Sequence, residues 1–206
     1  MSKSFLTLGI TGGIASGKST VARALEAVGI PVLDADQLSR ELSSPGGLAA
    51  PAILKRFSTL DRPQLRELIF KDKQAKLDLE AILHPIIQQE SLKRLEVLSQ
   101  KSRVLSATLK PWVAYEAILL LEAGRKSDID HLLLVEAPEE MRKQRLLKRD
   151  SISDALAETI LKSQTSDEKR RQLGQGVATF TVTNEGDTPF SIKQQIDHLV
   201  LELQRQ

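Results

Sequence analysis

Residues 12–19, Gly-Gly-Ile-Ala-Ser-Gly-Lys-Ser, match the phosphate-loop pattern G-x-x-x-x-G-K-[ST]. The apolar run 5–10 before them predicts a buried strand, and the apolar spacing over 21–28 predicts a helix. In that order the backbone N–H groups of a glycine-rich turn converge on phosphate oxygens at the positive end of a helix dipole. Lys18 would reach the β and γ phosphates, and the Ser19 hydroxyl would bind Mg²⁺. The sequence therefore predicts a protein that binds a nucleoside triphosphate, rather than a glycine turn that matches by chance.

Two carboxylates follow the second predicted strand, residues 30–33, at Asp34 and Asp36. In open α/β sheets ligands bind at the carboxyl ends of the strands. An acid there could orient water on Mg²⁺ or accept the proton of an attacking hydroxyl. The alternative for either residue is that it caps the helix that begins near Asp36.

Three further apolar runs predict the remaining strands, at 103–107, 131–135 and 178–183. The run 117–122 cannot be assigned by periodicity, and an apolar face over 192–203 predicts a closing helix. Five strands that alternate with helices predict an α/β fold with a doubly wound parallel sheet.

Strand signals are missing from 38–101, where helical patterns follow one another with prolines between them. We expect an all-helical insertion in which one helix ends near His84 and the next begins at Pro85, with Leu77 and Leu92 facing inward. A lone histidine at such a junction is usually a surface or capping group.

After the fourth predicted strand, Arg142, Arg145 and Arg149 share one face of a helix. Such a stripe is either a solvated face or a lid that brings positive charge to a transferring phosphoryl group, and the phosphate loop favours the lid. The charged run 167–171 is predicted to lie at the surface.

Composition excludes several classes of protein. The 206 residues carry 29 Lys and Arg against 27 Asp and Glu, a net charge of +2 that gives no reason to expect a nucleic-acid or membrane surface. An aromatic content of 3% disfavours single-strand nucleic-acid binding, and the lack of cysteine excludes disulfides and thiolate sites. We expect a soluble cytoplasmic protein, either a monomer or a weak homo-oligomer.

These patterns favour a small-molecule kinase. The chain has no Asn-Lys-x-Asp run for reading guanine, and no clear acid ends the third predicted strand. The identity of the small metabolite stays open at this point. A protein of a different class also stays open, namely a nucleotide-dependent switch whose helical insertion binds a protein.

The motifs also resemble, in order and nearly end to end, those of the dephospho-CoA kinases, which phosphorylate the ribose 3′-hydroxyl of dephospho-CoA in the last step of coenzyme A synthesis. The loop 9–20 is similar to that family's loop, with Ala15 where glycine is usual. Arg142 stands where the family commonly has glutamine, Glu122 ends a variant of its Pro-Leu-Leu-Phe-Glu motif, and Gln164 stands where it has glutamine. The other matching segments are 33–36 with Arg40, 60–62, 79–87, 145–150 and 184–186.

The resemblance implies a phosphate-loop kinase with three parts. The nucleotide-binding core would comprise 1–35, 102–138 and 176–206, the helical acceptor-binding domain 36–101, and the helical lid 139–175. The substrates would be ATP, with Mg²⁺, and dephospho-CoA.

The resemblance also implies roles for single residues. Asp36 would be the general base and, with Ser19, would lie at the Mg²⁺, while Lys18, Arg145 and Arg149 would act on the transferred phosphoryl group. The residues expected at ATP are Gly13, Ile14, Ala15, Ser16, Gly17, Lys18, Ser19, Thr20, Asn184 and Gly186. Those expected at the acceptor are Thr11, Asp34, Arg40, His84 and Glu122.

Overall fold

The computed structural model describes residues 3–118, 120–122, 124–186 and 189–206. Leu119, in the run that periodicity could not assign, lies outside the described residues. The sequence 184–187 is typical of a turn after the fifth strand, and its last residue, Asp187, lies outside them too. Contacts divide the chain into two compact units. We call Met1–Val32 with Glu96–Gln206 the sheet unit, and Leu33–Leu95 the helical unit.

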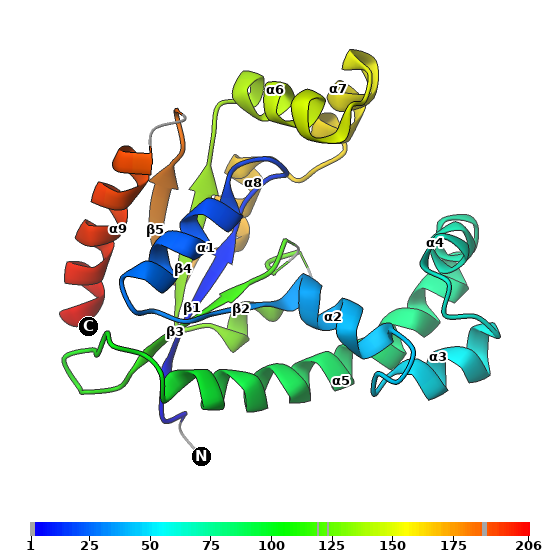
Figure 1. The fold of residues 1–206 in the computed structure, drawn as a ribbon, viewed down its shortest axis with the longest axis horizontal. Coiled ribbons are helices and arrows are strands. Elements are labelled where there is room, and N and C mark those ends of the chain that lie inside the picture. Colours follow the sequence, from blue (N-terminus) through cyan, green and yellow to red (C-terminus); the bar gives the residue numbers. More distant parts are fainter. Residues whose placement is uncertain (1–2, 119, 123, 187–188) are drawn as a thin grey trace. The chain divides into compact units, whose positions relative to one another are not determined.

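The sheet has five strands in the order β2-β3-β1-β4-β5 (Figure 1). The pairings β1–β3, β1–β4 and β4–β5 are parallel, so consecutive strands are joined by crossovers that contain helices. This is the doubly wound sheet that the sequence predicts. The strands are β1 Leu6–Thr11, β2 Val32–Asp34, β3 Trp112–Glu116, β4 His131–Glu136 and β5 Ala178–Thr183.

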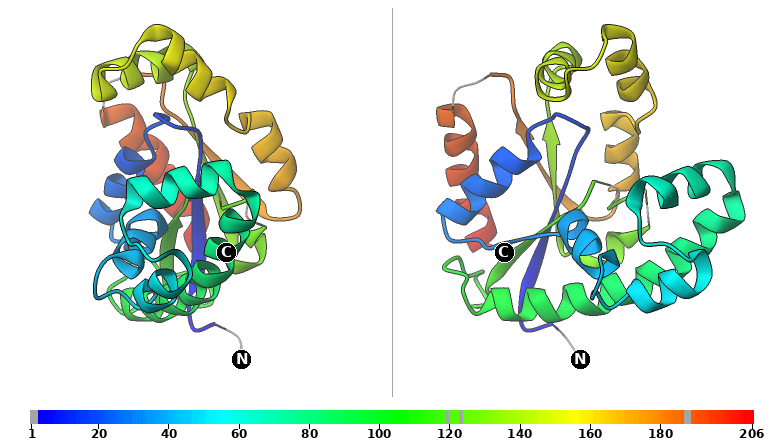
Figure 2. Two further views of the ribbon diagram at one scale, coloured as in Figure 1. Left: turned by 90° about the vertical axis from the view of Figure 1, so that its right-hand side faces the viewer. Right: turned by 45° about the vertical axis from the view of Figure 1, so that its right-hand side comes forward.

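Helices α1 (Lys18–Ala27) and α9 (Pro189–Gln204) pack on one face of this sheet, and α8 (Asp167–Leu173) lies on the other (Figure 2). The apolar side of α9 that the sequence predicts is part of the main core. Trp112 is 0% exposed in that core, and its Nε1 donates to the Leu203 carbonyl at 3.0 Å. The last turn of α9 is thereby bonded to the third strand.

The predicted third strand at 103–107 is wrong. In that segment only Leu105 forms a bridge, an isolated antiparallel one with Pro111, and the strand itself is β3. The run 112–116 is buried along its whole length and pairs with β1 from Leu6↔Trp112 to Ile10↔Glu116. The runs 103–107 and 112–116 are both apolar, and the second of them forms the strand next to β1. Sequence periodicity does not encode which run takes that inner position in the sheet. An acid, Glu116, therefore ends the third strand, contrary to the sequence-based expectation.

The helical unit is built on four helices. Its core gathers around Ile53 and Leu65, and the ion pair Arg56–Asp78 at 2.6 Å joins α3 to α5. The pair Arg94–Glu41, also 2.6 Å, joins α5 to α2, and the hydrogen bond from Arg94 lowers the pKa of Glu41. The helices are α2 Ala35–Ser43, α3 Ala50–Phe57, α4 Arg62–Lys71 and α5 Lys73–Ser99.

The helix boundary predicted at Pro85 is also wrong, because α5 runs through it for 27 residues. Proline removes one backbone donor from a helix interior, a cost that packing of the flanking turns can offset. Ile82 and Ile86, on either side of Pro85, both pack on the Ile53 cluster. Leu77 and Leu92, predicted to face inward, are 49% and 48% exposed.

Helices α6 (Glu139–Asp150) and α7 (Asp154–Lys162) form a hairpin after β4 (Figure 2). Lys143 binds Asp154 at 2.7 Å and Glu158 at 2.9 Å across it, and these two carboxylates raise the pKa of Lys143. The 3₁₀ helix Arg125–Asp128 precedes β4. No helix in the described part of the chain is long and apolar enough to cross a bilayer.

Candidate active site

The phosphate loop connects β1 to α1 in the sheet unit, and its backbone takes conformations that need small residues. Gly17 has φ +97° where α1 begins, and Ala15 has φ +59°. A Cβ on Gly12 would overlap the Val135 carbonyl oxygen, and one on Gly17 would overlap the Asn184 amide nitrogen. Glycine at both positions is therefore required by close backbone and side-chain approach.

Side chains bind five consecutive carbonyl groups of this loop. Donors on the carbonyl side favour a loop whose N–H groups point the other way, which is the arrangement that binds an anion. Lys18 Nζ donates to Gly12 at 2.9 Å and Gly13 at 3.1 Å, Arg142 Nε to Ile14 at 3.0 Å, Arg145 Nη1 to Ala15 at 3.2 Å, and Asn184 Nδ2 to Ser16 at 2.9 Å. The loop is thus ordered by its surroundings as well as by its glycines.

The residues available for a metal ion are hard oxygen donors. Ser19 is exposed in the first turn of α1, and its hydroxyl is the type of ligand that Mg²⁺ accepts. Among the described residues, no three or more His, Asp or Glu side chains gather into a group that could hold a metal ion. These donors fit an ion that takes most of its ligands from phosphate and water.

The arginines of α6 do not form a uniform stripe. Arg142 is 8% exposed and lies beside Gly13, while Arg145 bonds to the loop and to Asn184 Oδ1 at 3.0 Å. Arg149 is exposed and binds its neighbour Asp150 at 2.7 and 2.8 Å, which raises the pKa of Arg149. Burial lowers the pKa of Arg142, and the Asp167 carboxylate opposes that effect. The three guanidinium groups therefore have three different environments.

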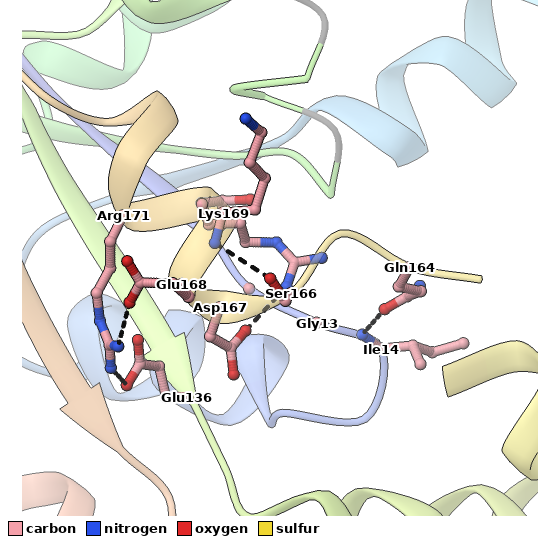
Figure 3. A network of polar contacts seen from close by, with 12 residues as sticks. Gly13, Ile14, Glu136, Gln164, Ser166, Asp167, Glu168, Lys169 and Arg171 are labelled. Atoms are coloured by element: carbon pink, nitrogen blue, oxygen red, sulfur yellow. Dashed lines mark hydrogen bonds and ion pairs between the residues drawn. The ribbon is translucent and has the colours of Figure 1, made fainter. Parts of the chain in front are cut away.

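A cluster of charges lies beside the loop. Arg170 is 2% exposed and binds Asp167 at 2.9 Å and Glu122 at 3.5 Å, and Asp167 lies 3.9 Å from Arg142. The prediction that 167–171 lies at the surface is thus wrong for Arg170, although Arg171 is exposed and binds Glu136 at 2.6 Å (Figure 3). The carboxylate of Glu122, expected at the acceptor, lies against Arg170.

Asn184 and Gly186 follow β5. The Asn184 side chain is buried and is directed to the loop and Arg145, and its backbone N–H donates to Glu136 at 2.7 Å. A Cβ on Gly186 would meet nothing within 4 Å. The adenine contacts expected of these two residues stay a prediction.

Four of the other expected residues can be placed as follows. Asp34 caps α2, because its Oδ1 accepts from the Asp36 N–H at 2.8 Å and the Gln37 N–H at 2.9 Å. The capping alternative therefore holds for Asp34, and Asp36 stands half-buried in the first turn. Arg40 on α2 and His84 on α5 are exposed.

Thr11 lies in the sheet unit at the end of β1. It is 0% exposed, and its Oγ1 donates to the Ile118 carbonyl at 3.2 Å. This bond ties the end of β1 to the segment that follows β3, so the hydroxyl of Thr11 serves the fold of the site.

The helical unit contains a pocket of about 850 Å³. Apolar side chains, among them Phe70 and Leu83, make much of its lining, and Arg62 and Arg66 add two guanidinium groups. Such a lining suits a ligand that is part apolar and part anionic.

Two residues of the site were missed in the sequence. Glu116 ends β3 beside Ile10, directly before the phosphate loop, and the signal for it was the aromatic and branched run 112–115. No pattern in the sequence indicates the burial of Arg170, because that burial depends on two carboxylates. Glu122 is distant in the chain, and Asp167 belongs to the same charged run, which is typical of a surface.

Comparisons with known proteins show relatives over most of the chain. The dephospho-CoA kinase family profile matches residues 6–189. A dephospho-CoA kinase from Geobacter sulfurreducens is 38% identical over 200 residues, which cover 93% of this chain and 95% of that protein. Another, from Syntrophotalea carbinolica, is 36% identical over 209 residues, with 97% and 92% covered.

Solved structures share the fold. A Thermus thermophilus protein superposes with a TM-score of 0.78 at 29% identity, covering 98% of this chain and 99% of its own. A dephospho-CoA kinase from Campylobacter jejuni gives 0.66 at 24% identity, with 96% of both chains covered, and a shikimate kinase from Acinetobacter baumannii gives 0.53 at 17%, with 96% and 94% covered. The last two show the fold alone. With the family profile and two relatives matching over nearly the whole length, the chain belongs to the dephospho-CoA kinase family.

Proposed function

We propose that this protein transfers the γ-phosphoryl group of ATP to the ribose 3′-hydroxyl of dephospho-CoA, giving coenzyme A and ADP. The observation that carries the proposal is the phosphate loop, whose five consecutive carbonyl groups are held by side chains in a chain of the dephospho-CoA kinase family. The bonds from Arg142, Arg145 and Asn184 hold three of these carbonyls without using Lys18, and such preorganisation is the main source of catalysis in phosphoryl transfer.

In this proposal the residues act through position and charge. Lys18 moves from the carbonyls of Gly12 and Gly13 to the β and γ phosphates, and Arg145 and Arg149 stabilise charge on the transferred group. Arg149 must exchange Asp150 for the phosphoryl oxygens, which its exposure permits. Asp36 accepts the proton of the 3′-hydroxyl as that oxygen attacks phosphorus.

Mg²⁺ would be held by Ser19 and Asp36 together with the phosphates, and it would supply positive charge that neutralises the phosphate oxygens. Both residues offer oxygen ligands, the type that this ion prefers. Glu116 ends β3 in the same unit as Ser19, and its carboxylate is a further oxygen donor of the type that this ion accepts.

We assign the acceptor to the pocket of the helical unit. Dephospho-CoA has a long pantetheine arm and a diphosphate, and the pocket offers apolar side chains together with Arg62 and Arg66. Arg40 and His84 are exposed on helices of the same unit and are proposed as acceptor contacts.

The test is ADP release with a panel of acceptors: dephospho-CoA, shikimate, a nucleoside and none, with the product identified by mass spectrometry. We expect fast turnover with dephospho-CoA alone. Asp36→Asn should lower kcat by about 10² or more, since general-base losses have that size. Lys18→Ala should abolish turnover.

The exposed ion pair Lys193–Asp197 on α9 offers matched controls. Lys193→Ala and Asp197→Asn make the same chemical changes away from the loop and should leave kcat unchanged. Turnover with shikimate would favour the other metabolite kinase, and ADP release that needs no acceptor would favour the switch. A kcat of Asp36→Asn within about threefold of wild type would refute the general base.

A further inference from the structure

Ile14 is held from two sides by the segment that follows β4. Its N–H donates to Gln164 Oε1 at 2.7 Å (Figure 3). Its carbonyl accepts from Arg142 Nε at 3.0 Å. Arg142 Nη2 in turn donates to the same Gln164 oxygen at 3.5 Å. The two side chains and the two peptide groups of Ile14 therefore form one closed ring of hydrogen bonds.

The side chain of Ile14 is held by the same hairpin. It packs on the buried cluster of Leu146, Ala157 and Leu161, which lies in the seam between α6 and α7. The carbonyl and the side chain of this loop residue are thus bound by a helical hairpin that begins 125 positions later in the chain, at Glu139, and its N–H is bound by Gln164 directly after that hairpin.

The charge of Arg142 is balanced from behind. Asp167 lies 3.9 Å from Arg142 and 2.9 Å from Arg170, and Arg170 lies 3.5 Å from Glu122. Two arginines and two carboxylates give a neutral cluster, which offsets the cost of burying a guanidinium beside the loop. Arg142 therefore stays fixed where its planar fork meets the loop.

We propose that Arg142 and Gln164 are positioning residues for ATP: they hold the peptide groups of Ile14 and so set the phosphate loop in the conformation that binds the triphosphate. This inference rests on the proposed function, and it gives the α6–α7 hairpin a task beyond closing over the reaction. Because the two side chains and Ile14 form one closed ring of hydrogen bonds, losing either side chain opens the ring, and losing both adds little.

The test measures KM for both substrates and kcat in Arg142→Met and Gln164→Leu, together with ATP affinity by calorimetry in magnesium chloride. We expect the KM and Kd for ATP to rise roughly tenfold in each variant, the loss expected for one hydrogen bond to a charged or buried group. The KM for dephospho-CoA should stay within twofold and kcat within threefold. The double variant should be less than threefold worse than either single one.

Matched controls are Arg205→Met and Gln172→Leu, which make the same changes at exposed positions. An unchanged KM for ATP in both site variants, or an equal rise in both KM values, would overturn the inference. If Arg142→Met does not fold, Gln164→Leu decides by the same criteria, since Gln164 is only half-buried. A wild-type protein that binds no ATP would instead overturn the proposed function, so the two failures are distinguishable.

Discussion

Gly17→Ala tests the coupling between the phosphate loop and Asn184. The backbone at Gly17 has φ +97°, where an L-residue costs about 1–2 kcal/mol. A Cβ there would overlap Asn184 Nδ2 and lie 3.2 Å from its Cγ, so the asparagine must move. It would then lose its bonds to Ser16 at 2.9 Å and Arg145 at 3.0 Å, together about 2.5 kcal/mol. We expect the free energy of unfolding to fall by about 4 kcal/mol.

A double-mutant cycle separates the two parts of this cost. In an Asn184→Ala background the clash is absent, so Gly17→Ala should cost only about 1.5 kcal/mol. Gly176→Ala is the matched control, because Gly176 has φ +88° and a Cβ there would meet nothing within 4 Å. Urea unfolding followed by circular dichroism measures the four proteins of the cycle and the control. Equal costs of Gly17→Ala in the two backgrounds, within about 0.5 kcal/mol, would refute the coupling.

Two further predictions concern stability. Arg170→Met should lower the free energy of unfolding by about 3–5 kcal/mol, because it leaves Asp167 and Glu122 without their buried cation. The matched change at its exposed neighbour, Arg171→Met, should cost less than about 1 kcal/mol. Similar costs of the two changes in urea unfolding would contradict the role given to the charge cluster. Burial lowers the pKa of His131 more than the Asp130 charge raises it, so the unfolded chain binds a proton below about pH 6.5 that the folded chain resists. Stability should therefore fall from pH 7.5 to 5.5, and less steeply in His131→Phe; identical pH slopes would refute this.

The parts of the fold that sequence predicted well depend on local chemistry. The phosphate loop, its strand and its helix lie within residues 6–27, where glycines, apolar runs and helix formers are neighbours in the chain. The fourth and fifth strands also agree with their apolar runs, and the apolar face of α9 packs as its spacing predicts.

The failures share a different cause. Residues 103–107 and 112–116 are both suited to a strand, and only pairing with β1 decides between them. Pro85 stays within α5 because Ile82 and Ile86 pack on a distant cluster. Tertiary partners outweighed the local signal in each case.

Burial of charge was equally invisible in the sequence. Arg142 and Arg149 occur on one helix seven residues apart, yet one lies beside Gly13 and the other in solvent. A charged run or a row of arginines on one helix face usually predicts exposed side chains. A carboxylate that the fold brings close can instead allow such an arginine to be buried. Asp34 was the opposite case, because a carboxylate just before a helix indicates a cap by local chemistry alone.

Trp112 is the single tryptophan of the chain, so its emission reports one place. The indole is sealed in the core, bonds to the last turn of α9, and meets the ring of His131 edge-on at 5.0 Å. Release of the carboxyl-terminal helix would admit water to the ring and shift its fluorescence to longer wavelength, while a proton on the imidazole would quench it. The fluorescence of the unmodified protein thus distinguishes release of α9 from protonation of His131.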